Sequence, residues 1–137
     1  MMVSTRGRYA LHMMIDLAQH EGQGSISLKA IAERQNLSMK YLEMIAALLN
    51  KSGLIVSMRG KEGGYMLARP ADAITVSEVI MSAEKSLAPV SCVEDKDSPC
   101  DHADGCLTLP MWKHLEEIID AYLSGVTIAD LIEGRVQ

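Results

Sequence analysis

The 137-residue chain is long enough for one domain, or for one small domain with an appended segment. It is 48% hydrophobic but only 4% aromatic and has no Phe, so Leu, Ile, Val, Ala and ten Met residues must fill the core. No apolar run approaches the roughly 18 residues that span a bilayer, and residues 1–10 do not resemble a secretory leader. These features argue against a membrane protein, and we expect a soluble, cytoplasmic one.

The formal net charge of −5 is unevenly distributed along the chain. Residues 1–69 carry nine Lys and Arg against five acids, a balance of +4, whereas residues 70–137 carry four against thirteen, a balance of −9. A basic half can face the phosphates of a nucleic acid while an acidic half stays away from them. Two ordinary solvated faces would give the same charge balance. The motifs must therefore show whether the basic half binds nucleic acid.

Apolar residues recur at three- and four-residue spacing in three successive segments, and a serine that can cap a helix precedes each segment. The expected helices are Thr5–Gln19 after Ser4, Leu28–Gln35 after Ser27, and Met39–Lys51 after Ser38. Two β-rich segments follow, Leu54–Arg59 and Tyr65–Leu67, with a glycine-rich turn between them. This spacing predicts a β-hairpin.

The second half is expected to contain further helices around an irregular segment. Thr75 and Glu78 form a capping box that opens a helix to about Ser86, and a similar box at Thr127 opens a short final helix. Residues 87–108 have no periodicity and hold all three cysteines. A long helix, about Leu109 to Leu123, carries an apolar stripe made of Met111, Trp112, Leu115, Ile118, Ile119 and Tyr122. The fold class is therefore mostly α with a small β-hairpin.

The order helix, helix, tight turn, helix, hairpin is typical of a winged helix-turn-helix, in which 39–51 would lie in the major groove of DNA. Lys40 and Tyr41 can reach phosphates or base edges, and Glu43 can accept a hydrogen bond from cytosine N4. At the hairpin tip Arg59 suits a narrow minor groove, and glycines allow close approach of the backbone to phosphate. The predicted DNA-binding residues are Ser38, Lys40, Tyr41, Glu43, Arg59, Gly60 and Lys61.

Two functions of other classes compete with DNA binding. A protein-interaction module that kept the winged-helix fold without operator binding would suit the acidic second half. A thiol oxidoreductase would require Cys-x-x-Cys, which the chain lacks, and no motif assembles a Ser/His/Asp site. We therefore expect a regulator rather than an enzyme.

Several strings resemble the IscR-type family of bacterial transcription regulators. They are Gly7-Arg8-Tyr9-Ala10, Ser38-x-x-Tyr41-Leu42-Glu43, and the wing Gly53-Leu54-Ile55-x-Ser57-x-Arg59-Gly60-x-x-Gly63-Gly64-Tyr65-x-Leu67. The resemblance covers nearly the whole chain and implies a homodimer that binds a palindromic operator in double-stranded DNA. It places DNA reading at the positions named above, Lys61 aside, and the dimerisation helix at about Leu109–Leu123. The expected division is 1–86 for the winged helix-turn-helix, 87–108 for a cysteine loop, and 109–137 for the dimerisation helix and the short last helix.

The three cysteines, Cys92, Cys100 and Cys106, lie in the segment between two predicted helices. Thiolates ligate iron and zinc, and a loop allows three of them to converge. The resemblance implies that they hold a [2Fe-2S] or [4Fe-4S] iron–sulfur cluster. Zinc, metal-free redox thiols and no chemistry at all are the alternatives.

A cluster also needs a fourth ligand, and the residues that serve other family members are not present here. Leu109 stands where one branch has a histidine, and Arg8 stands where another has an acid. The remaining possibilities are an exogenous thiol or water, or one of the loop residues Glu94, Asp95, Asp97, Asp101, His102 and Asp104. Gain or loss of the cluster would reshape the loop and so change operator affinity.

Overall fold

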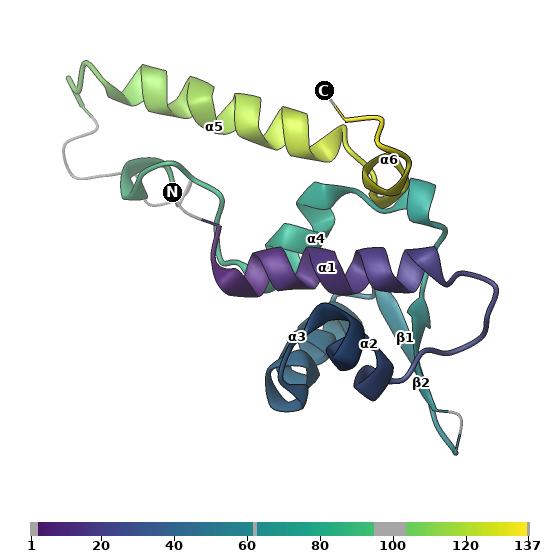
Figure 1. Cartoon of the computed structure of the whole chain (residues 1–137). Helices are drawn as coiled ribbons and strands as arrows, with labels where there is room; N and C mark the ends of the chain where they lie inside the picture. Colours follow the sequence, from purple (N-terminus) through teal and green to yellow (C-terminus); the bar gives the residue numbers. More distant parts are fainter. Residues whose placement is uncertain (1–2, 62, 95–103, 137) are drawn as a thin grey trace.

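The computed structural model describes residues 3–61, 63–94 and 104–136 (Figure 1). The elements in chain order are α1 (Thr5–Gln19), α2 (Leu28–Gln35), α3 (Met39–Lys51), β1 (Ile55–Met58), β2 (Gly64–Leu67), η1 (Ala71–Ala73), α4 (Val76–Ala83), η2 (Ser91–Val93), α5 (Leu109–Ser124) and α6 (Ile128–Glu133). The expected fold class is confirmed, because the described residues are mostly helical and carry one two-stranded hairpin.

The serine caps define the first three helices as the sequence predicts. The side chains of Ser4, Ser27 and Ser38 each accept a hydrogen bond from the backbone N–H group three residues later. Each cap satisfies one of the N–H groups that a helix leaves unpaired at its start. Helix α2 ends at Gln35, and the next residue, Asn36, has a left-handed backbone (φ 54°) that turns the chain sharply into α3. This turn completes the helix-turn-helix.

The hairpin is antiparallel, with Ile55 opposite Leu67 and Met58 opposite Gly64. The Tyr65 N–H also donates to the carbonyl of Ile26 at 2.8 Å, and the Ile26 N–H donates back at 2.9 Å. The hairpin is therefore joined to the segment that leads into α2. Only glycine fits at position 64, because a Cβ there would collide with the Ile26 carbonyl.

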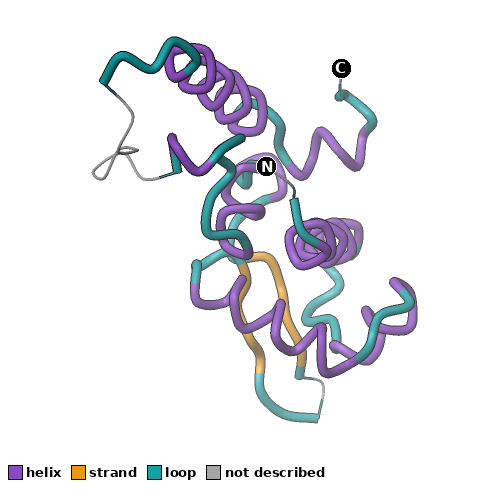
Figure 2. Tube along the Cα trace, turned by 90° about the vertical axis from the view of Figure 1, so that its left-hand side faces the viewer, coloured by secondary structure: helices purple, strands orange, loops and turns teal. Residues whose placement is uncertain are grey.

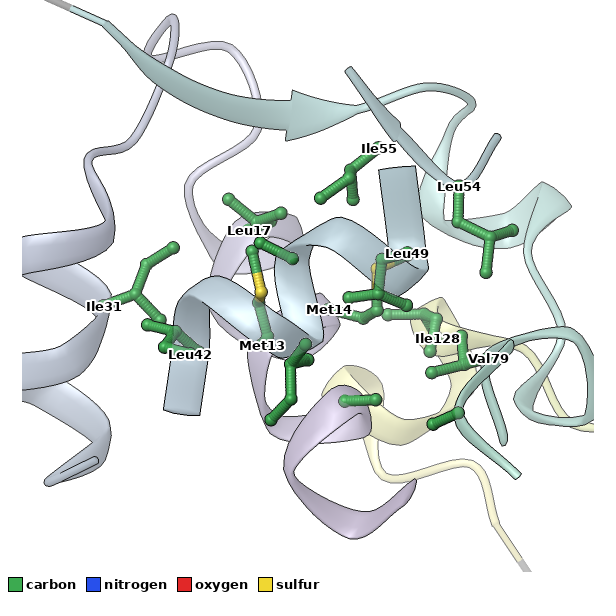
Figure 3. Close-up of a cluster of buried hydrophobic side chains, with 14 of the residues drawn as sticks. Met13, Met14, Leu17, Ile31, Leu42, Leu49, Leu54, Ile55, Val79 and Ile128 are labelled. Carbon is green, nitrogen blue, oxygen red and sulfur yellow. The ribbon is translucent and has the colours of Figure 1, made fainter. Parts of the chain in front are cut away.

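Helix α1 lies at the centre of the core (Figure 3). Its buried side chains Met13, Met14 and Leu17 belong to one cluster with residues of α2, α3, β1, α4 and α6, among them Ile31, Leu42, Leu49, Ile55, Val79 and Ile128. Each such side chain contributes about 1.5–3 kcal/mol through burial. Aliphatic residues and methionines fill this core, as the composition predicts.

Helix α4 ends at Ala83, before the expected end near Ser86. Glu84 takes an extended conformation, and its carboxylate accepts hydrogen bonds from the Ser4 backbone N–H at 2.7 Å and from the Ser4 hydroxyl at 2.5 Å. A Cβ at Gly7 would lie 2.7 Å from the same carboxylate. The end of α4 is thus set by a contact with the start of α1.

Helix α5 lies outside the core, above α4 in Figure 1, and its outer position is also visible in Figure 2. It packs through Ile119 and Leu123 against a second, smaller cluster formed by Val76, Ile80 and Leu87. The short helix α6 turns back, and Ile128 enters the main core. Within the described ranges, no helix combines the length and apolarity needed to cross a membrane.

Candidate nucleic-acid interface and cysteine segment

Helix α3 has one buried face and one solvent face. Leu42, Ile45 and Leu49 are buried against α1 and the hairpin, which fixes the rotation of the helix. Lys40 and Glu43 consequently lie on the exposed face. Both belong to the first two turns, the part of a recognition helix that enters the major groove.

Ser38 and Tyr41 have structural contacts besides their expected role at DNA. The Ser38 hydroxyl accepts from the Tyr41 N–H at 3.1 Å and is thus the cap of α3. The Tyr41 ring is half-buried and packs edge-on against Tyr9 of α1, with ring centroids 5.8 Å apart. This contact links the start of α3 to α1, so it helps to hold the recognition helix in place.

The hairpin tip projects beyond the helices (Figure 1) and presents Arg59, Gly60 and Lys61 to solvent. Gly60 has φ of 113°, a conformation that side chains rarely adopt, and its carbonyl accepts from the Gly63 N–H at 3.0 Å. The turn therefore depends on glycine and exposes two cations beside it.

The cations of α3 and of the hairpin tip differ from two others in the basic half, Arg34 and Arg69. Within the described part of the chain, Lys40, Arg59 and Lys61 form no ion pair. Arg34 and Arg69, by contrast, are paired with acids at 2.7 and 2.8 Å. Among the described residues, Arg6, Arg8, Lys29 and Lys51 are in no ion pair either. What distinguishes Lys40, Arg59 and Lys61 is their exposed position on α3 and at the hairpin tip, where a winged helix contacts DNA.

Asp16 is a structural residue that the sequence patterns do not predict. Its carboxylate is 1% exposed and accepts hydrogen bonds from Arg34 Nε and Nη2, at 2.9 and 2.7 Å, and from Gln35 Nε2 at 3.1 Å. Burial raises the pKa of Asp16, but the hydrogen bonds from Arg34 and Gln35 and the charge of Arg34 outweigh it and leave the pKa below its ordinary value. The signal in the sequence was an acid within the apolar stripe of α1.

The described cysteines lie near one end of α5. Cys92 is in η2, which packs on α5, and Cys106 precedes the first turn of α5. Cys92 lines a cleft of about 680 Å³ together with Lys85, Leu87, Leu109 and Lys113. Cys100 and the proposed fourth ligands Asp95, Asp97, Asp101 and His102 lie outside the described residues.

The environment of Cys106 favours its thiolate. The pKa of this thiol is lowered by the Thr108 hydroxyl, which lies 3.4 Å from Sγ, and then by the backbone N–H groups of Thr108 and Leu109. A thiolate is the form that binds metals and attacks disulfides. The donor chemistry at Cys106 therefore fits an iron–sulfur cluster, although the described residues alone contain no group of three metal-ligating side chains.

The fold, together with the exposed cations of α3 and of the hairpin tip, defines a class of protein, the winged helix-turn-helix transcription regulators. Within this class, the model of the Rrf2 family, described as iron-dependent transcriptional regulators, matches residues 3–134. The chain belongs to the Rrf2 family, which confirms the resemblance to IscR-type regulators and the expectation that it is not an enzyme.

Known proteins of this family are similar over nearly the whole chain. A putative HTH-type regulator of Neisseria meningitidis is 41% identical over 98% of this chain and 90% of its own. The regulator IscR of Erwinia tasmaniensis is 38% identical over 98% of this chain and 81% of its own. Among solved structures, CymR, the global cysteine regulator of B. subtilis, superposes with a TM-score of 0.79 at 36% identity, covering 98% of both chains. IscR of T. potens superposes with a TM-score of 0.78 at 38% identity, covering 98% of this chain and 88% of its own.

Proposed function

We propose that the protein is a homodimeric transcription regulator of the bacterial cytoplasm whose binding to a palindromic operator is modulated by an iron–sulfur cluster. The observation that carries the DNA-binding part is the exposed position of Lys40 on α3 and of Arg59 and Lys61 at the hairpin tip, where a winged helix contacts DNA. Helix α3 enters the major groove with Lys40 and Glu43, and the hairpin tip enters the minor groove with Arg59.

Selection of duplexes from a random pool by the full chain tests operator binding. We expect an enriched inverted repeat, to which Arg59→Ala binds at least ten-fold more weakly. Arg135→Ala is the control, since it removes another exposed cation, one paired with Asp130 near the C-terminus, and should retain the affinity. Absence of any enriched sequence, or equal losses for both variants, would contradict the proposal.

The exposed stripe of α5 supports the dimer. Met111, Leu115, Ile118 and Tyr122 recur at four-, three- and four-residue spacing and are 54%, 37%, 51% and 49% exposed. This spacing places them on one side of the helix, while Ile119 and Leu123 face the chain's own second cluster. A second copy of α5 covers such a stripe with the same residues, as a two-fold interface requires. Two winged domains joined in this way match a palindromic site.

For the cofactor, we propose that Cys92, Cys100 and Cys106 hold the cluster, with the fourth ligand among Glu94, Asp95, Asp97, Asp101, His102, Asp104 and an exogenous group. The lowered pKa of the Cys106 thiol and the iron-dependent family description support this assignment. A bound cluster supplies a redox- and iron-sensitive group. The cysteine segment, residues 87–108, is connected to α4 on one side and to α5 on the other, so a change in this segment can reach both helices.

The cofactor is tested by purification without oxygen, followed by visible absorption and by iron and sulfide counts. We expect a coloured protein with bound iron and sulfide, and their loss in Cys106→Ala. Operator affinity should then differ between the cluster-loaded and the cluster-free dimer. A colourless, iron-free protein from cells with working cluster assembly would contradict the cofactor, and equal affinities would contradict the switch.

Metal-free thiol sensing is the second candidate, and the lowered pKa of Cys106 favours it as well. A solved structure of S. aureus CymR in an oxidised form, 38% identical with a TM-score of 0.74, is similar to this chain. Under this alternative, an iron-free protein would lose operator affinity after peroxide treatment and recover it with a thiol reductant, and Cys106→Ala would not respond.

A further inference from the structure

Two methionines border the charged part of the exposed face of α3. Met39 and Met44 are 41% and 40% exposed, although the helix has a well-filled buried face on its other side. At 100° per residue, Glu43 and Lys40 lie between them around the helix. The side of α3 that faces the major groove is therefore apolar, charged and again apolar across its width.

Helix stability does not explain these methionines, because Lys, Gln and Met have similar helix propensities. Single exposed apolar residues are ordinary on protein surfaces. Here, however, both methionines are within the first two turns of α3 and next to the two charged side chains expected at the base edges. Contacts made only in the complex account for their positions better than contacts within the chain.

The chemistry of the major groove identifies the contact. Its base edges present hydrogen-bond donors and acceptors, and the C5-methyl group of thymine is their apolar group. Methionine is long, unbranched and adaptable, so it can cover a methyl group whose position varies. We propose that Met39 and Met44 read thymine methyl groups on the two sides of the base pair that faces Glu43.

This inference rests on the proposed operator binding and predicts the composition of the half-site. Glu43 accepts from the N4 amino group of a cytosine, and thymines flank that base pair on either strand. Removal of one buried methyl group should raise the dissociation constant about four-fold, because this factor corresponds to the free energy of burying one CH2-sized group.

The test replaces each thymine of the selected duplex in turn by deoxyuridine, which lacks the C5-methyl group and keeps the base pair. Dissociation constants are measured for the full-length dimer and for Met39→Gln and Met44→Gln, which are close in size and lie on the exposed face, so folding is retained. We expect some deoxyuridine positions to weaken wild-type binding about four-fold. Each variant should lose the methyl dependence at one set of positions and keep it at the other.

Met58→Gln is the matched control. Met58 is 49% exposed on β1, beside the hairpin tip that is expected in the minor groove, where the thymine methyl group is not presented. This variant should keep the full methyl dependence. The inference is overturned if no deoxyuridine position weakens binding, or if Met39→Gln and Met44→Gln retain the wild-type pattern. Failure to select any duplex would instead overturn operator binding itself, so the two failures are distinguishable.

Discussion

At the scale of single residues, the Asp16 carboxylate joins α1 to α2. It is buried, and it accepts three hydrogen bonds from Arg34 and Gln35. The first two helices therefore keep a fixed angle, and α3 follows α2 through a turn of few residues. A carboxylate far from the expected DNA surface thus helps to place the recognition helix.

Asp16→Asn should lower the free energy of unfolding by about 2 kcal/mol, because the amide cannot accept both guanidinium hydrogen bonds of Arg34. Chemical denaturation measures this loss. Glu78→Gln is the control, since the Arg69–Glu78 pair is exposed and should contribute less than about 1 kcal/mol. Equal losses for both variants would show that burial of Asp16 adds nothing.

The pair of Asp16 and Arg34 also predicts that the free energy of unfolding depends on pH. The pKa of Asp16 is lower in the folded chain than its ordinary value of 3.8, so its contribution is complete above that value. It is lost as the pH falls through the folded pKa, when the carboxylate takes up a proton. Wild-type stability should decline below about pH 4 more steeply than that of Asp16→Asn. Parallel pH profiles of the two proteins would contradict this assignment.

Glu43 is expected to confer specificity more than affinity. Glu43→Ala should relax discrimination at one base pair of each half-site by about 1–3 kcal/mol, because the acceptor for cytosine N4 is removed. Binding to non-specific duplex should be unchanged or slightly stronger, since a negative charge near phosphate is lost. The measurement compares dissociation constants for duplexes with single substitutions. Unchanged discrimination at every position would remove Glu43 from the base-reading set.

Sequence patterns predicted the residues of this surface that depend on local rules. Serine caps, the apolar period of α3 and the glycines of the hairpin tip together determine that Lys40, Glu43 and Arg59 are exposed. The contacts of Tyr41 with Tyr9 and of Asp16 with Arg34 were not predictable in this way. Both join helices distant in sequence, and a single sequence does not show which helix faces pack together.

At the scale of elements, α5 differs from the other long helices because only Leu109 of its described residues is buried. A helix of this length with so little core contact is stabilised when a partner covers its apolar side. The sequence predicted the extent and stripe of this helix. It did not predict that α6 returns to the main core, where Ile128 packs beside α1, nor that Glu84 ends α4 by capping α1.

Ile118→Glu should convert the proposed dimer to a folded monomer, since the charge would be buried at the interface but exposed in the single chain. Light scattering coupled to size exclusion gives the mass, and circular dichroism confirms the fold. Asp120→Lys is the control on the other side of α5 and should remain dimeric. A dimeric Ile118→Glu protein would contradict an interface built on this stripe.

At the scale of the whole molecule, the division of charge along the chain matches the division of the fold into DNA-binding elements and the remaining elements. The half with a balance of +4 contains the helix-turn-helix and the hairpin, and the half with −9 contains the cysteine segment and α5. This arrangement presents cations to DNA and keeps acids away from it. The net charge of −5 is therefore the sum of a basic half and an acidic half and characterises neither of them. Taken alone, this total would argue against DNA binding.

The salt dependence of operator affinity is a direct measure of DNA binding through α3 and the hairpin tip. A dimer that brings Lys40 and Arg59 into the grooves and Lys61 against the phosphates, from both chains, releases counterions on binding. The logarithm of the association constant should therefore fall steeply and linearly with the logarithm of salt concentration. Lys61→Ala should reduce the slope by about one for each lost phosphate contact. Operator binding that is independent of salt, or a slope unchanged in Lys61→Ala and Arg59→Ala, would contradict DNA binding through these cations.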